Sequence, residues 1–136
     1  IHTLRTVDDA LALRADLDAV PSRVVVIGAG FIGSEVAATA RGRGLDVTVL
    51  EGLPVPLRRG LGERMGLRMA QVHRDNGVDL RLDVTVQAIE GEDRVQQVRL
   101  ADGTVIPADV VVVAVGGRPA TGWLEDCRHN NDHGEV

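Results

Sequence analysis

In the first 82 residues, short runs of β-branched residues alternate with longer segments in which apolar residues recur at helical spacing. A strand needs only a short apolar run, whereas an amphipathic helix repeats apolar residues every three or four positions. Thr6 and Asp9 form a capping-box pattern at the start of the first helix, and Pro21 ends that helix. The expected elements are helices over 7–19, 31–42 and 62–76 and strands over 23–27, 46–51 and 78–82.

The segment before the third expected helix is a loop. Residues 52–60 contain two prolines, which suit neither a helix nor an inner strand. The helix that follows is expected to end at Asn76 and Gly77. Its larger apolar residues are expected to point toward the core, and they are Leu61, Met65, Leu67, Met69 and Val72.

After residue 82 the pattern changes from helical spacing to alternation of apolar and polar residues. Turn sequences separate three such runs, which predicts an antiparallel meander in place of a crossover helix. These expected strands lie at 84–88, 95–100 and 104–106. Residues 110–115 are apolar throughout, which is typical of a central parallel strand covered on both faces. The expected fold class is therefore α/β, a Rossmann-like parallel sheet with a three-stranded antiparallel β-meander crossover.

Composition excludes several classes of function. The 136 residues suffice for one domain with its own core. A net charge of −5 argues against a nucleic-acid partner, which requires a basic excess. No stretch approaches the roughly 20 apolar residues of a membrane-spanning helix. The single cysteine, Cys127, cannot form an internal disulfide, and this favours a cytoplasmic protein.

A Gly-x-Gly-x-x-Gly sequence directly follows the first expected strand. Gly28 permits a tight turn, Gly30 lets the backbone approach a pyrophosphate, and Gly33 lets the helix pack close to the strand. The helix begins at Phe31 and Ile32, where unpaired N–H groups and a partial positive charge attract phosphates. These five residues are expected to bind a dinucleotide.

Three further residues complete the expected dinucleotide site. Glu51 ends the second expected strand, where an acid accepts both hydroxyls of the adenosine ribose and repels a 2′-phosphate, so NADH is favoured over NADPH. A solvated acid at a strand end is the alternative interpretation. Gly116 and Gly117 end the last parallel strand and are expected to lie against the nicotinamide half, although a plain strand-ending turn has the same sequence.

The pattern as a whole resembles one flavoprotein family. The order of elements is a βαβαβ unit, a meander and a strand ending in Ala-Val-Gly-Gly-Arg-Pro at 114–119. It is similar to the NAD(P)H-binding domain of the FAD-dependent pyridine-nucleotide oxidoreductases, which include glutathione reductase. Within that family the chain is most similar to the ferredoxin, rubredoxin and putidaredoxin reductases of oxygenase systems. The segments that support the resemblance are 4–9, 28–38, 49–51, 98–103, 107–109 and 123–125.

The resemblance implies that hydride passes from NADH to a flavin and that electrons continue to a ferredoxin-type acceptor. It implies a connection from an FAD domain over 1–22, an NAD(H)-binding domain over 23–125 and a polar return toward the FAD domain over 126–136. The FAD domain of the same parent chain is expected to be the partner and to hold the FAD. No catalytic residue is expected in this chain, and the chain alone is expected to bind NADH weakly.

The resemblance also adds two cofactor-binding candidates. Glu35 matches the family's Glu close to the nicotinamide, although an acid at a helix N-terminus is favourable in itself. Arg59 matches a common family Arg, and beside it Arg58 is in reach of the pyrophosphate or adenine, whereas solvent-exposed loop charge is the favoured interpretation of both. A metal site at His129 and His133 is disfavoured because no helix or further ligand accompanies them.

Two alternatives to a ferredoxin reductase stay open. A glutathione-reductase-type disulfide reductase shares the fold and differs by a redox cysteine pair outside this chain. A non-catalytic module that binds NAD(H) has the same fold, and fold alone does not separate it from an enzyme. An S-adenosylmethionine methyltransferase uses a similar turn and acid, but the third glycine and the meander argue against it.

Overall fold

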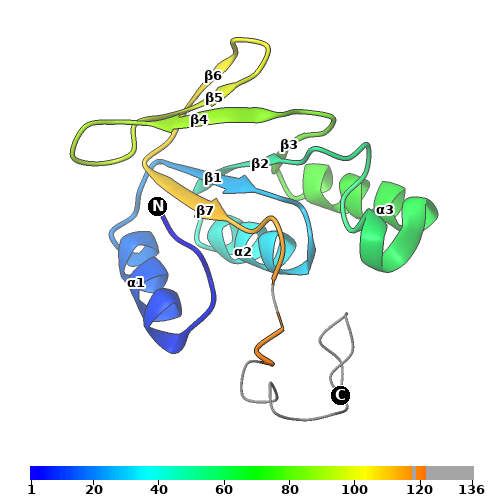
Figure 1. The fold of residues 1–136 in the computed structure, drawn as a ribbon, viewed down its shortest axis with the longest axis horizontal. Helices are drawn as coiled ribbons and strands as arrows, with labels where there is room; N and C mark the ends of the chain where they lie inside the picture. Colours follow the sequence, from blue (N-terminus) through cyan, green and yellow to red (C-terminus); the bar gives the residue numbers. More distant parts are fainter. Residues whose placement is uncertain (118, 122–136) are drawn as a thin grey trace.

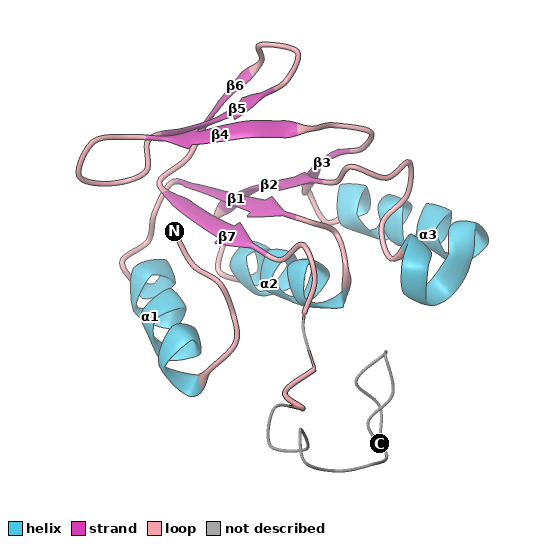
Figure 2. Ribbon diagram, in the orientation of Figure 1, coloured by secondary structure: helices cyan, strands magenta, loops and turns pink. Residues whose placement is uncertain are grey.

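A computed structural model describes residues 1–117 and 119–121 as an α/β fold with three layers (Figures 1 and 2). Helices cover one face of a central parallel sheet, and a small antiparallel sheet covers the other. The helices are α1 (Val7–Asp18), α2 (Phe31–Gly42) and α3 (Arg58–Asp75). The strands are β1 (Arg23–Ile27), β2 (Asp46–Leu50), β3 (Asp79–Arg81), β4 (Val86–Glu90), β5 (Gln97–Leu100), β6 (Val105–Pro107) and β7 (Val110–Val113).

The parallel sheet has the strand order β3-β2-β1-β7, and the antiparallel sheet has the order β4-β5-β6. β1 pairs in parallel with β2 on one side and β7 on the other. His2 adds an isolated parallel bridge to Val112 at the β7 edge. The expected fold class, a parallel sheet with a β-meander, is therefore confirmed.

The uninterrupted apolar runs follow from burial on both faces of the parallel sheet. In β1, Val24 and Val26 belong to the core beneath the helices, whereas Val25 belongs to the core beneath the antiparallel sheet. β7 divides in the same way, since Val110 and Val112 face the helices and Val111 faces the meander. Alternate residues thus enter different cores, as the strand period of two requires.

The α1 helix begins as the capping-box pattern predicts. The Thr6 hydroxyl accepts a hydrogen bond from the Asp9 N–H, and the Asp9 carboxylate accepts one from the Thr6 N–H. Leu13 and Leu17 bury their side chains in the core on the helical side of the sheet. α1 is therefore part of the packed domain in the described residues.

The predicted orientation of α3 is wrong. Leu61, Met65, Leu67 and Val72 are exposed, and Met69 is half-buried. The buried residues are Gly66, Ala70 and His73. A Cβ at Gly66 would lie 2.6 Å from the Pro56 carbonyl oxygen, so the helix packs through its small residues at close range. The helix also begins four residues earlier than expected, with a kink at Gly62, where φ is 75°.

Several strands are shorter than expected or shifted along the chain. β3 and β7 are shorter than the predicted strands, and β4 begins at Val86 where the alternation predicts residue 84. β4 also continues past its predicted end at residue 88, because a register shift between Val86 and Ala88 turns Ile89 toward the core beside Val98. One extra residue in a strand reverses the side to which all later side chains point.

His73 lies between α3 and α2 and is 5% exposed. Its Nε2 lies 3.2 Å from the Ser34 hydroxyl oxygen. Burial lowers the pKa of the His73 imidazole below its ordinary value of about 6.5. The unfolded chain therefore binds a proton at this imidazole more tightly than the folded chain does.

We expect the free energy of unfolding to fall as the pH drops below about 6.5, because protonation of His73 favours the unfolded state. Urea titrations between about pH 7.5 and about pH 5 measure this dependence. A His73→Gln variant keeps a polar group near Ser34 but does not titrate, so its stability should change less over the same range. The same pH dependence in both proteins would contradict this role of His73.

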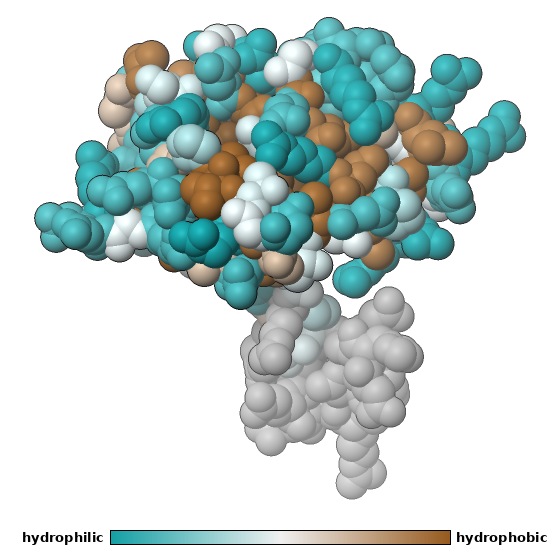
Figure 3. All heavy atoms as spheres, turned by 90° about the horizontal axis from the view of Figure 1, so that it is seen from above, coloured by the Kyte–Doolittle hydropathy of each residue, from teal (hydrophilic) through white to brown (hydrophobic). Residues whose placement is uncertain are grey.

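The described surface is mixed in character. On the face shown in Figure 3, hydrophilic residues predominate and apolar residues are grouped among them. Among the described residues, no helix has both the length and the hydrophobicity that crossing a bilayer requires.

Candidate functional site

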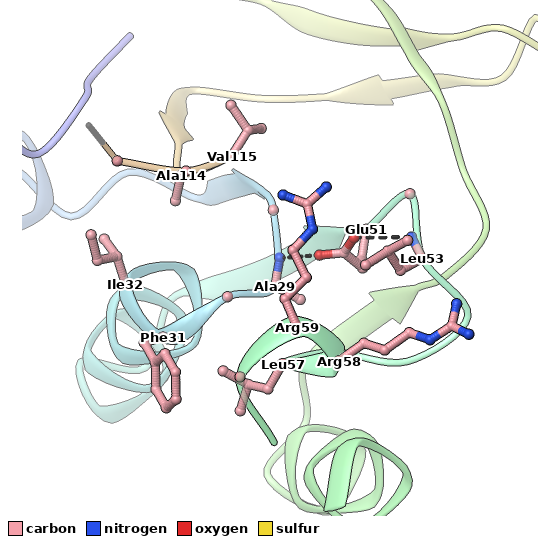
Figure 4. Close-up of a pocket in the computed structure, with 16 residues that line it drawn as sticks. Ala29, Phe31, Ile32, Glu51, Leu53, Leu57, Arg58, Arg59, Ala114 and Val115 are labelled. Atoms are coloured by element: carbon pink, nitrogen blue, oxygen red, sulfur yellow. Dashed lines mark hydrogen bonds between the residues drawn. The ribbon is translucent and has the colours of Figure 1, made fainter. Parts of the chain in front are cut away.

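The carboxyl ends of the parallel strands border a cavity of about 510 Å³ (Figure 4). Its walls come from the turn after β1, the segment after β2 and the end of β7. Open α/β sheets bind their ligands at this edge. Eight residues that were predicted to bind the dinucleotide line it, namely Gly28, Gly30, Phe31, Ile32, Glu51, Arg59, Gly116 and Gly117.

Gly28 and Gly33 have structural reasons to be glycine. Gly28 has a φ of +100°, and a Cβ there would lie 2.5 Å from the Ala114 carbonyl oxygen. A Cβ at Gly33 would lie 1.9 Å from the Gly28 carbonyl oxygen. Gly33 does not line the cavity, because it faces the backbone of the turn at Gly28. Its lack of a side chain allows α2 to approach this turn closely. These contacts fit the tasks expected of the two glycines.

Gly30 stands at the N-terminal end of α2 beside open space. It is the N-cap residue, and no side chain makes a capping hydrogen bond there. A Cβ at Gly30 would meet no atom within 4 Å. The first N–H groups of a helix have no partner within the helix, so here they are available to an anion in the cavity. Phe31 and Ile32 lie at the same helix end and are exposed.

Glu51 follows β2, is half-buried and lines the cavity. Its Oε2 accepts a hydrogen bond from the Ala29 N–H at 2.6 Å, and its Oε1 accepts one from the Leu53 N–H at 2.9 Å (Figure 4). A carboxylate offers about four lone-pair sites, so these two bonds leave capacity for ribose hydroxyls. The position of Glu51 therefore fits the expected adenosine end of the site.

Arg58 and Arg59 open α3 at the cavity wall. Both side chains are exposed, and within the described residues neither makes a hydrogen bond or an ion pair. In the view of Figure 4 the Arg59 side chain extends toward the turn that contains Ala29, whereas Arg58 extends away from that turn. Arg59 is therefore the better placed of the two to meet a phosphate.

Gly116 and Gly117 form the opposite wall, beyond the end of β7. Both are exposed, and a Cβ at either would meet no atom within 4 Å. Gly116 has a φ of +147°, which a side chain rarely permits. Bare backbone at this wall leaves space for a flat ligand.

Glu35 is not brought together with the other candidates. It is exposed on α2 and lies outside the cavity, next to the grooves that separate α2 from α1 and α3. The helical period explains this, because residue 35 lies about half a turn away from Gly33, which faces the β1 turn.

Several residues of the site were not predicted. Ala29, Leu53 and Leu57 contribute backbone or apolar walls, as do Ala114 and Val115. Their side chains have no polar or charged group that would indicate a binding site. Only their closeness in sequence to the glycine turns or to Glu51 could have identified them. Among the described residues, no three His, Cys, Asp or Glu side chains gather as metal ligands. Cys127, His129 and His133 lie outside the described residues.

Comparison with known proteins places these features in a family. The model for pyridine nucleotide-disulphide oxidoreductases matches residues 1–135. Rhodocoxin reductase from Rhodococcus erythropolis is 45% identical over 120 residues, covering 88% of this chain and 28% of that protein. The ferredoxin–NAD(+) reductase component of the p-cumate 2,3-dioxygenase system from Pseudomonas putida is 40% identical over 119 residues, covering 88% of this chain and 29% of that protein.

A solved structure agrees with these relatives. The ferredoxin reductase for the CYP199A2 system from Rhodopseudomonas palustris superimposes with a TM-score of 0.83 at 40% identity, covering 88% of this chain and 30% of that chain. The chain thus spans less than a third of the length of the relatives it matches. The family match includes the glycine turn, Glu51 and both sheets. The chain belongs to the pyridine nucleotide-disulphide oxidoreductase family.

Proposed function

We propose that this chain is the NAD(H)-binding domain of a FAD-dependent oxidoreductase that passes electrons from NADH through a flavin to a ferredoxin-type acceptor. One observation carries the proposal: a single cavity joins the glycine turn, the acid after β2 and the two glycines after β7. The names of the relatives, which are reductases of ferredoxin systems, favour electron transfer over reduction of a disulfide.

The residues of the cavity fit the parts of NADH in order along the sheet edge. The N-terminus of α2 beside Gly30 would hold the pyrophosphate, with Arg59 as a second cation. Glu51 would accept the adenosine ribose hydroxyls, and Gly116 and Gly117 would lie against the nicotinamide half. Glu35 is retained as a residue for the nicotinamide half once the FAD domain is in place.

Bound NADH supplies a hydride, and the residues of this chain bind and orient the NADH molecule. We propose no catalytic acid or base and no metal ligand in this chain. The FAD and the FAD domain belong to the rest of the parent chain. We also propose a cytoplasmic location, because a single cysteine suits a reducing compartment.

Calorimetric titration of the 136-residue chain tests the binding part of this proposal. We expect NADH to bind at least about tenfold more tightly than NADPH, because the Glu51 carboxylate repels a 2′-phosphate. Glu51→Ala should reduce this preference. Glu63→Ala, which removes an exposed acid of α3, serves as the control and should leave it unchanged.

Equal affinity of the wild-type chain for both nucleotides would contradict the assignment of Glu51, and no binding of either would contradict the function of the domain. The flavin part is tested on the longer parent protein, which should purify with bound FAD and lose the visible absorbance of the flavin when NADH is added.

A further inference from the structure

The Glu51 carboxylate joins two separate loops of the cavity. Oε2 bonds to the Ala29 N–H in the glycine turn at 2.6 Å, and Oε1 bonds to the Leu53 N–H in the segment after β2 at 2.9 Å. Hydrogen bonds to an ionised acceptor are about twice as strong as those between neutral groups. The Glu51 side chain therefore connects the glycine turn to the segment after β2, and both of these segments line the cavity proposed to bind the dinucleotide.

Both backbone polar groups of Ala29, its N–H and its carbonyl oxygen, make hydrogen bonds within the protein. Its N–H donates to Glu51, and its carbonyl oxygen accepts a hydrogen bond from the Leu57 N–H at 2.9 Å. The Ala29 side chain is fully buried. If Glu51 released it, the Ala29 N–H would lose its partner inside the protein, which costs free energy.

The backbone of Glu51 is fixed independently of its side chain. Its N–H donates to the Arg81 carbonyl oxygen at 2.9 Å, and its carbonyl oxygen accepts from the Val84 N–H at 3.1 Å. The carboxylate therefore projects from a rigid base into the glycine turn. Leu57, the other partner of Ala29, immediately precedes Arg58 and Arg59.

We infer that Glu51 is a positioning residue that holds the glycine turn against the segment 51–57 before any dinucleotide binds. This inference rests on the proposed function, because positioning matters only if the cavity binds a dinucleotide. The positioning role is separate from the proposed contact of Glu51 with the ribose hydroxyls. It keeps the α2 N-terminus and the start of α3 at a constant separation. The binding site is thereby pre-organised, which reduces the entropic cost of binding.

Amide hydrogen exchange of the ligand-free chain tests this role without reference to NADH. The two N–H groups donate to different oxygens of Glu51, and in Glu51→Gln one of these oxygens becomes an NH2 group, which only donates, so one of the two N–H groups loses its acceptor. We expect the Ala29 or the Leu53 amide to exchange at least about tenfold faster in this variant. Glu63→Gln is the matched control, and the exchange of both amides should stay at its wild-type rate.

If Glu51→Gln fails to fold, Glu51→Asp gives the same test, because it keeps the charge and shortens the reach by one methylene. Wild-type protection of both amides in a folded variant would overturn the inference. A failure of the chain to bind NADH would overturn the proposed function instead, and the exchange result would still decide the role of Glu51.

A second measurement separates positioning from ribose recognition. NADH is compared with an analogue that lacks both hydroxyls of the adenosine ribose. Positioning predicts that Glu51→Gln weakens the binding of both molecules by about fivefold or more. A variant that weakens NADH alone and binds the analogue like the wild type would overturn the inference.

Discussion

A Gly28→Ala variant should lose about 3 kcal/mol or more of its free energy of unfolding. Two effects add at this position. The φ of +100° is unfavourable for a residue with a side chain, and the new Cβ would lie 2.5 Å from the Ala114 carbonyl oxygen. Ala114 directly follows β7, so relief of this contact would disturb the pairing of β7 with β1. Urea unfolding followed by circular dichroism measures the loss.

Gly103→Ala is the matched control for Gly28→Ala. Gly103 also has a positive φ, +88°, but a Cβ there would meet no atom within 4 Å. Its substitution should cost only the backbone strain, about 1–2 kcal/mol. The difference between the two variants isolates the contact with Ala114, and equal losses would contradict that contact.

A Gly30→Asp variant should lose NADH binding and keep its fold. Gly30 has a φ of −76° with open space beside it, so the backbone accepts a side chain. Asp is a preferred N-cap and interacts favourably with the helix dipole, so the stability should stay unchanged or rise by about 1 kcal/mol. Its carboxylate would occupy the site proposed for the pyrophosphate and repel it, so affinity should fall at least about 100-fold. Calorimetry and urea unfolding measure the two quantities.

Gly30→Asn separates the charge from the volume of the new side chain. Asn has nearly the same shape and is also a good N-cap. We expect its loss of NADH affinity to be clearly smaller, on the order of tenfold, because it adds no repulsion. Equal losses for Asp and Asn would mean that steric exclusion alone acts at Gly30. Full affinity in the Asp variant would place the pyrophosphate elsewhere.

The central sheet and its layers were predictable because a continuous apolar run is typical of a strand that is buried on both faces. Val24, Val25 and Val26 are all apolar because alternate residues enter two different cores. The orientation of α3 was not predictable in the same way. Gly66 and Ala70 make its closest contacts, and small residues give no hydrophobic signal to identify the packed face.

The site was predictable where it depends on particular residue types. Gly28 is required by backbone geometry, and Glu51 is a carboxylate at the end of a strand. Leu53 and Leu57 were missed because they act through backbone N–H groups, which every residue except proline has. The hydrogen bonds of Glu51 to Ala29 and Leu53 depend on how two loops meet, and no local pattern contains that information.

The pairing of β1 with β7 also has a consequence for the folding kinetics. The ion pair of Arg23 with Asp109 at the start of these strands joins residues 86 positions apart. Closing so long a loop is entropically costly, and parallel strands that are distant in sequence associate slowly. The β4-β5-β6 hairpins are local and shorten this loop as they form. We therefore expect the meander to fold early. The pairing of β7 with β1 is expected to form late.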